Sequence, residues 1–288
     1  MLTVRTLRVA KDEARRAVEP WAAPGAFVRP EDPPDRLANT MWVGAAEALG
    51  CLGLKAGTEA TTGALAAAIA GRHTISGARV RGDGAAFDLT FLVPPSVSWV
   101  WAQARADLRV RVEEAVVDAA YHSLQYLIWK LRGDKGASVP GFAAAVALHV
   151  VGQSRPQAPP PPLLHVHSYL VGVLDEFGEL RGPRRSSLFE DDVLLASGAF
   201  GRAKLAEDLR GLGFGTEVVS GRDGLPSFEI SGVPEGLLRV GESADMGCAG
   251  LGQVTDCEPW EPVPWEPDPW EPDPWEADPW ESGPWRNG

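Results

Sequence analysis

One stretch of the sequence, residues 147–174, limits the possible folds most strongly because it requires two neighbouring strands. An apolar run that ends at His149 is followed by the segment SRPQAPPPP and then by LLHVHSYLVGVL. Proline at this density is incompatible with a helix or a central strand, so we expect a stiff loop here. Such a loop allows the second strand to return beside the first.

These two predicted strands carry three of the five histidines of the chain. His165 and His167 are two residues apart, and side chains two apart on a strand share a face. The returning strand brings His149 beside that pair. Neutral imidazoles bind divalent metals well, and three of them leave coordination positions open for substrate or water. The alternative, two half-exposed histidines without a ligand, stays open on spacing alone. The opposite register is mostly apolar and predicts the core side: Leu164, Val166, Ser168 and Leu170.

Residues 87–93 show the alternation of a half-buried strand. Phe87, Leu89 and Phe91 fall on one face, whereas Asp88 and Thr90 fall on the other. A carboxylate on the polar face can hold an imidazole tautomer or accept a proton if it lies near the histidines. A strand acid that only faces water is the alternative.

Several segments together resemble the TrwC-type (MobF) conjugative relaxases, HUH-class nucleases that nick one strand of plasmid DNA. They are FDLTFLVPPSVSWVWA at residues 87–102, the histidine stretch GFAAAVALH…PPLLHVHSYLVGVLDEFGELR, and the downstream GAFGRAKLAEDLRGLGF and FEISGVPEGLL. They occur in the family's order, and the resemblance spans residues 1–240. It implies a bacterial protein of plasmid mobilisation with single-stranded DNA as partner. It also implies a divalent ion, Mg²⁺ or Mn²⁺, on His149, His165 and His167, assisted by Asp88.

The sequence departs from the family pattern at the nucleophile. The family keeps catalytic tyrosines in an N-terminal helix and loop, but here the approximate positions hold Val18, Trp21 and Phe27, and the first tyrosine is Tyr121. A phenyl ring lacks the phenolic oxygen that attacks phosphorus. We therefore expect a divergent relaxase-like protein without tyrosyl transesterification, and whether it is an enzyme stays open. Tyr169, on the face of the histidine pair, is a second candidate nucleophile.

Two arginine groups are candidate DNA contacts. Phosphate contacts give affinity without reading sequence, and arginine in loops suits them. An ordinary solvated loop is the alternative for the first group. The candidates are Arg72, Arg79 and Arg81 in one polar loop, and Arg181, Arg184 and Arg185 after the histidine strand.

The overall pattern predicts an α+β fold with a mostly antiparallel five-stranded sheet and helices packed on one face. The predicted strands outside the histidine stretch are residues 2–9 and 87–93, with a hairpin at 216–219 and 227–230. The predicted helices are residues 11–18, 58–70, 108–131 and 186–211, and a short one opening at Pro234. We place the domain at residues 1–240 and a separate tail at 241–288.

The tail changes the character of the chain. Tryptophan recurs every five residues from Trp260 to Trp285 in PWEPD-like units. Proline and acids at this density prevent a core, which predicts a disordered tail. Exposed indoles are common interface anchors, so the competing function is a non-enzymatic protein that binds a partner through this tail. Loss of function on deleting residues 257–288 alone would favour it.

Composition sets the remaining expectations. The net charge is −12, and residues 257–288 hold nine acids and one arginine, so the excess of acid is concentrated in the tail. Three unpatterned cysteines and the lack of a signal peptide predict a cytoplasmic protein. No apolar run is long enough to span a membrane. No GKT or GKS phosphate loop occurs, so we expect no ATP-driven step.

Overall fold

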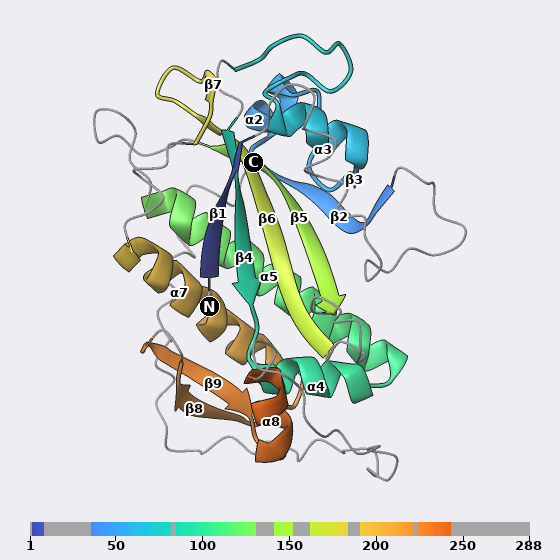
Figure 1. The fold of residues 1–288 in the computed structure, drawn as a ribbon, viewed down its shortest axis with the longest axis vertical. Coiled ribbons are helices and arrows are strands. Elements are labelled where there is room, and N and C mark those ends of the chain that lie inside the picture. The colour runs from blue at the N-terminus through green and yellow to red at the C-terminus, as the bar shows by residue number, and fades with distance from the viewer. Residues whose placement is uncertain are drawn as a thin grey trace.

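The computed structural model describes residues 2–8, 36–81, 85–130, 141–151, 162–183, 191–221 and 224–242. Its centre is an antiparallel sheet with the strand order β1-β4-β6-β5-β2-β3, and β7 pairs with β6 (Figure 1). The two histidine-bearing strands lie side by side in the middle of this sheet. The strands are β1 (Leu2–Arg8), β2 (Arg36–Gly44), β3 (Glu59–Thr61), β4 (Ala85–Leu92), β5 (Phe142–Val151), β6 (Pro162–Leu174) and β7 (Leu180–Arg181).

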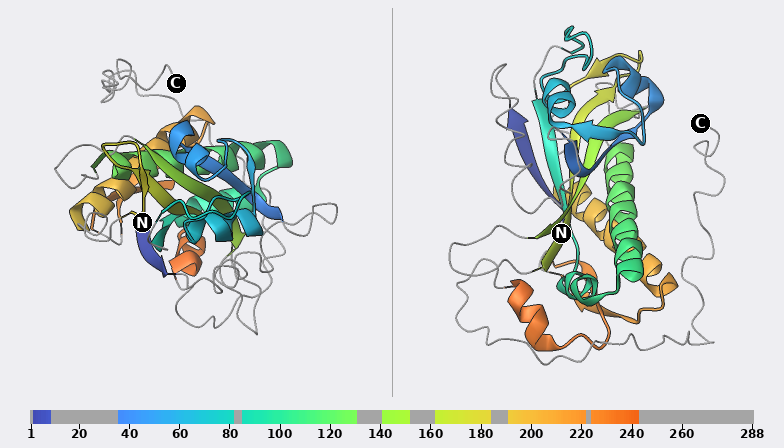
Figure 2. Two further views of the ribbon diagram at one scale, coloured as in Figure 1. Left: turned by 90° about the horizontal axis from the view of Figure 1, so that it is seen from above. Right: turned by 90° about the vertical axis from the view of Figure 1, so that its right-hand side faces the viewer.

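Two long helices cover one face of this sheet. They are α5 (Ala106–Lys130) and α7 (Asp191–Gly211), which lie behind the strands in Figure 1 and along one side of them in Figure 2. A smaller group of elements lies at the end of the sheet where β6 begins. It comprises α4 (Pro95–Gln103), the hairpin of β8 (Thr216–Ser220) and β9 (Pro226–Ile230), and α8 (Glu235–Glu242).

The helix α5 forms because apolar residues recur every three or four positions, which gives the helix an apolar stripe. Val112, Val116, Ala120 and Leu124 are all buried along that stripe. They pack against the apolar register of β4 and β6, in which Leu164 is fully buried. This is the face that the alternation in the sequence assigned to the core.

The histidine face of the sheet has a cover of its own, which begins beside the histidines and extends toward the end of β6. Two short helices, α2 (Ala46–Cys51) and α3 (Thr62–Ile69), pack there over Ala143 and Ala145 of β5 and over Tyr169 of β6. Trp42 is 1% exposed within the same cluster. Helices therefore pack on the predicted face, and in addition two short helices cover part of the other face.

Two buried serines fasten α4 to its neighbours. The Ser96 hydroxyl accepts a hydrogen bond from the Ile230 amide at 2.8 Å, and the Ser98 hydroxyl accepts one from the Leu164 amide at 3.0 Å. The Glu229 carboxylate in turn accepts from the Ser96 amide at 3.0 Å, which suits the positive end of a helix. The start of β6, next to His165, is thereby tied to α4.

Most predicted elements are present with shifted ends. Residues 58–70, predicted as one helix, contain the short strand β3 before α3, whose first turn is capped by the Thr61 hydroxyl. The predicted helix at residues 11–18 and the tail at 243–288 lie outside the described residues. No helix in the described ranges has both the length and the apolar character needed to cross a membrane.

At Gly201, α7 lies close to both α5 and the sheet. A Cβ atom there would lie 2.7 Å from Phe91 Cε2 and 2.8 Å from Ser123 Cβ. We expect Gly201→Ala to destabilise the fold by about 1–3 kcal/mol, because overpacking forces the surrounding elements apart. Gly211→Ala on the same helix is the matched control, since a Cβ there meets nothing within 4 Å. Thermal unfolding followed by circular dichroism checks this, and equal melting temperatures for the two variants would contradict it.

Candidate metal centre

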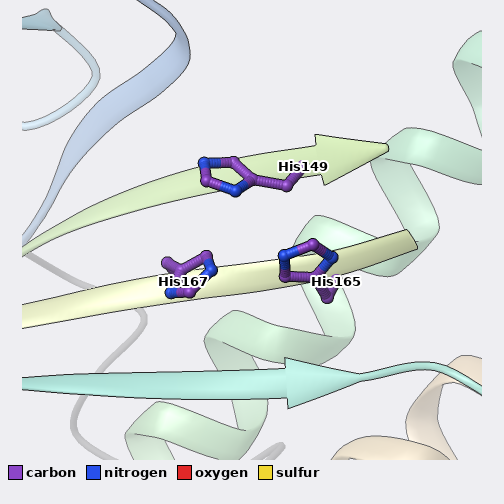
Figure 3. Close-up of side chains that lie close together, drawn as sticks. All are labelled: His149, His165 and His167. Atoms are coloured by element: carbon purple, nitrogen blue, oxygen red, sulfur yellow. The ribbon is translucent and has the colours of Figure 1, made fainter. Parts of the chain in front are cut away.

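The three histidines lie on adjacent strands and on one face of the sheet (Figure 3). His149 of β5 is the direct cross-strand partner of His165 of β6, and His167 follows two residues later. The alternation of the two strands explains this, because residues two apart face the same side and the antiparallel register sets His149 opposite His165. The predicted return of the second strand beside the first is confirmed.

The three imidazoles form a compact cluster. The distances between ring centroids are 5.1 Å for His149 and His165, 4.6 Å for His149 and His167, and 5.0 Å for His165 and His167. One nitrogen from each ring can be chosen so that all three lie within 4.8 Å of one another. These residues can therefore hold a metal ion with three nitrogen ligands, which fits a centre that keeps positions open.

Hydrogen bonds on the outer nitrogens orient two of the rings. His165 Nδ1 lies 3.0 Å from the Leu163 carbonyl oxygen, and His167 Nδ1 lies 2.7 Å from Asp88 Oδ1. Both partner oxygens accept a hydrogen bond from the Nδ1–H group, so each ring presents the lone pair of Nε2. The Thr90 hydroxyl lies 3.3 Å from His167 Nδ1 and adds a second contact on that atom. A carboxylate behind a histidine ligand is a common arrangement in metal sites.

The surroundings keep two imidazoles neutral. Burial and the neighbouring His167 and His165 lower the pKa of His149 to about 3. Burial also lowers the pKa of His165 to about 4, partly offset by its hydrogen bond to the Leu163 carbonyl. Only the neutral ring has a lone pair for a metal. At neutral pH protons therefore do not compete with a metal for these two side chains.

Asp88 lies in the interior beside the histidines. Asp88 is 2% exposed. In the pairing of β4 with β6, Asp88 is the cross-strand partner of Tyr169, and Thr90 is the partner of His167. The sequence placed Asp88 on the polar face of β4. That face is the histidine face of the sheet, where Asp88 is bonded to His167. The alternative of a strand acid facing water is wrong. A role for Asp88 in chemistry stays a prediction.

The three tyrosines are all poorly placed to act as a nucleophile. Tyr169 is 1% exposed, and burial together with the Asp88 carboxylate raises its pKa well above the ordinary value. Tyr121 and Tyr126 belong to α5, on the opposite face of the sheet, where they pack against Phe142 and Phe200. The burial of Tyr169 argues against the hypothesis that it attacks phosphorus.

The first group of candidate DNA-binding arginines is divided by burial. Arg81 is only 4% exposed and donates to the carbonyl oxygens of Ala68 and Ile69 at the end of α3. It therefore serves that helix end and cannot contact phosphate, which corrects the prediction. Arg72 donates to the Gly77 carbonyl at 2.7 Å and is half-buried. Arg79 is exposed and stays a candidate.

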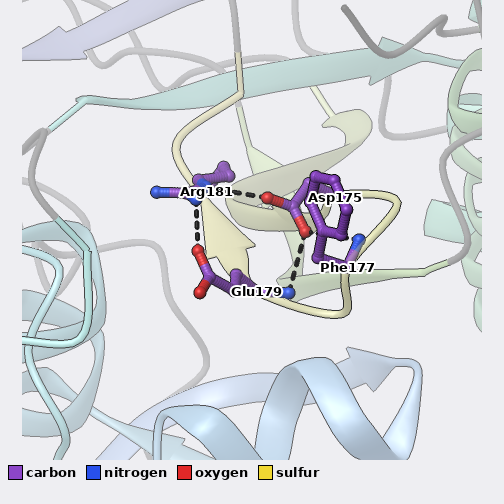
Figure 4. Close-up of polar contacts among 4 residues, drawn as sticks. All are labelled: Asp175, Phe177, Glu179 and Arg181. Atoms are coloured by element: carbon purple, nitrogen blue, oxygen red, sulfur yellow. Dashed lines mark hydrogen bonds and ion pairs between the residues drawn. The ribbon is translucent and has the colours of Figure 1, made fainter.

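The second group lies after β6. Arg181 is exposed but forms ion pairs with Asp175, at 2.9 Å, and with Glu179 (Figure 4). Together with Glu176, residues 175–181 carry three acids and one arginine, so this turn has a net charge of −2. Such a turn repels phosphate, which argues against a DNA contact by Arg181. Arg184 and Arg185 lie outside the described residues.

Two supporting residues were not predicted from the sequence as parts of the site. Thr90 shares the face of Asp88 by simple alternation, so its contact with His167 was within reach of the pattern. Ser98 could not be found this way, because its bond to the Leu164 amide joins residues 66 apart in the chain.

Comparison with known proteins agrees with this geometry. A family model described as TrwC relaxase matches residues 33–240. No curated protein matches the sequence. Three similar solved structures are of conjugative relaxase TrwC in complex with OriT DNA. The metal-free one is 19% identical and covers 84% of this chain and 79% of that chain, with a TM-score of 0.58. The copper-bound one is 21% identical, covers 83% and 78%, and has a TM-score of 0.60. The metal-bound one is 19% identical, covers 87% of both, and has a TM-score of 0.56. At such identities the likeness in structure shows the fold.

Proposed function

This chain belongs to the TrwC relaxase family, and from that premise we propose that it binds single-stranded DNA and that its residues His149, His165 and His167 bind a divalent metal ion. The observation that carries the proposal is the convergence of three imidazoles on one face of the sheet. Solved relatives with this fold are complexes with OriT DNA, some of them metal-bound, which supports both ligands.

The donor set favours a transition metal over magnesium. Mg²⁺ prefers oxygen ligands and retains its water, whereas imidazole suits first-row transition ions. Of the two ions expected from the sequence, Mn²⁺ is therefore the better fit for three nitrogen ligands. When bound, such an ion polarises the phosphate oxygen of the bond to be cleaved.

This chain has the residues that the family's chemistry needs for binding a metal ion, as distinct from the nucleophilic tyrosine. His165 and His167 are oriented by Leu163 and Asp88, and Asp88 stabilises positive charge on His167 as an ion binds. None of the three tyrosines is placed as the nucleophile, because Tyr169 is buried and Tyr121 and Tyr126 lie on the opposite face of the sheet. We therefore propose DNA and metal binding without tyrosyl transesterification.

The competing function, a protein that binds a partner through its PWEPD tail, rests on residues outside the described ranges. The convergence of three imidazoles on one face of the sheet supports the metal-binding function instead, because three nitrogen ligands so close together suit a divalent ion. A cytoplasmic location and a role in plasmid mobilisation are part of the proposal.

Calorimetry with Mn²⁺ and Mg²⁺, followed by fluorescence anisotropy with a labelled random-sequence single strand, tests this function. We expect Mn²⁺ to bind at least about tenfold more tightly than Mg²⁺ because its imidazole affinity is higher. We expect single-stranded DNA to bind in a salt-dependent manner and more tightly than the matching duplex. Equal affinity for the two ions, or no preference for the single strand, would contradict the proposal.

A further inference from the structure

Tyr169 lies directly beside the metal centre without being able to serve it as a nucleophile. It follows His167 by two residues on β6, so both side chains share the histidine face. The tyrosine and imidazole rings are nearly parallel, with an interplanar angle of 7° and centroids 5.8 Å apart. By contrast, the contacts among the three imidazoles are tilted or edge-on, with angles of 50° to 78°. The ring of His167 is thus aligned with the ring of Tyr169 and with neither of the other two imidazoles.

From this geometry we propose that the ring of Tyr169 is a positioning element that fixes the plane of His167 for metal binding. This inference rests on the proposed function and deepens it. Asp88 and Thr90 both contact His167 Nδ1, at 2.7 Å and 3.3 Å. The hydrogen bond to Asp88 selects one tautomer only while the ring keeps Nδ1 aimed at the carboxylate, and two contacts on this single atom do not prevent the ring from tilting away. An offset-parallel aromatic neighbour restrains the tilt, because stacked rings prefer such arrangements.

The restraint is effective because Tyr169 itself cannot move. It is 1% exposed and packs in the cluster that Trp42, Leu49 and Leu65 form with α2 and α3. A packed interior of this kind resists small displacements. The two short helices on the histidine face therefore support the metal centre through Tyr169.

The inference requires the aromatic ring and not the hydroxyl group. Tyr169→Phe keeps the ring, whereas Tyr169→Leu keeps an apolar side chain in the cluster but removes the flat surface. Val171→Ala is the matched control, since Val171 is fully buried on the same face of β6, two residues further along, in the same cluster. It removes packing from that cluster and leaves the stack intact.

Two measurements on the full chain test this. Calorimetry gives the Mn²⁺ affinity, and nitrogen-15 NMR of the imidazoles in metal-free protein gives the tautomer of His167. We expect Tyr169→Phe and Val171→Ala to match the unaltered chain in both. Tyr169→Leu is expected to bind Mn²⁺ roughly tenfold more weakly, as for lost supporting contacts in other metal sites. It is also expected to show a mixture of His167 tautomers.

The possible results separate this inference from the proposed function. Circular dichroism first confirms that each variant is folded. Wild-type affinity and a single tautomer in Tyr169→Leu would overturn the inference, and so would a loss in Tyr169→Phe, which would assign the role to the hydroxyl. If the unaltered chain fails to bind Mn²⁺, the proposed function fails, and the tautomer measured without metal still decides whether Tyr169 orients His167.

Discussion

Replacing both His165 and His167 by alanine is expected to weaken Mn²⁺ binding by more than about 100-fold. Loss of a single outer partner of a metal ligand already costs about 10- to 100-fold in affinity. The double variant removes two of the three nitrogen ligands and leaves His149 alone, which cannot hold a divalent ion tightly. Calorimetry on both proteins measures the effect.

The control for this experiment is His122→Ala. His122 lies on α5, on the far side of the sheet, where its Nδ1 is 2.9 Å from the Asp118 carbonyl oxygen. The His122→Ala variant removes one imidazole from the chain and leaves the three-histidine cluster unchanged, so its Mn²⁺ affinity should equal that of the unaltered chain. If the double variant bound Mn²⁺ as well as the unaltered chain, the ion would be held elsewhere and the proposed function would be wrong.

The site was predictable to the extent that it depends on local periodicity. Spacing of two put His165 and His167 on one face, and the proline-rich segment between two apolar runs implied that His149 returns beside them. Alternation likewise placed Asp88 on the polar face of its strand. The antiparallel register then made His149 the partner of His165, a relation that spacing constrains but does not determine.

The predictions that the structure argues against have a common physical origin, because the neighbours of a side chain in the fold decide its exposure and its charge partners. Arg81 looks like a loop cation in the sequence, yet its guanidinium is buried against the end of α3. Arg181 looks like part of a basic cluster, yet Asp175 and Glu179 pair with it across a turn. Tyr169 shares the face of the histidines, and α2 and α3 bury it. The sequence gives the type and charge of each side chain, but its neighbours in the fold decide whether it is available to bind DNA or to react.

The second large effect concerns the covalent chemistry of the family. We expect the unaltered chain to form no covalent adduct with single-stranded DNA in the presence of Mn²⁺. Transesterification to tyrosine needs an accessible phenolic oxygen that can lose its proton. The first tyrosine of the sequence is Tyr121, and Tyr169 is buried with a raised pKa. A labelled random-sequence oligonucleotide run on a denaturing gel reports any adduct as a retarded band.

Restoring a tyrosine tests whether the three-histidine site can still support attack on the DNA phosphate. Val18→Tyr, Trp21→Tyr and Phe27→Tyr each reintroduce a tyrosine where the family pattern keeps one, at positions outside the described residues. We expect at least one of them to form an adduct that requires Mn²⁺ and disappears when His165→Ala and His167→Ala are added. The attack joins the phenolic oxygen to phosphorus and releases a deoxyribose hydroxyl, so the free strand should shorten as the adduct appears.

The controls assign any adduct to a particular residue. Tyr169→Phe in the unaltered background removes the tyrosine nearest the histidines, and Tyr126→Phe removes one on the far face. An adduct formed by the unaltered chain and lost only in Tyr169→Phe would show that Tyr169 becomes accessible and reacts, against its burial. An adduct in none of the restored variants, with Mn²⁺ binding intact, would mean that the chain binds metal and DNA in a geometry unfit for in-line attack. In that case three converging imidazoles are not sufficient for the family's chemistry, and the path of the DNA across the sheet must also differ.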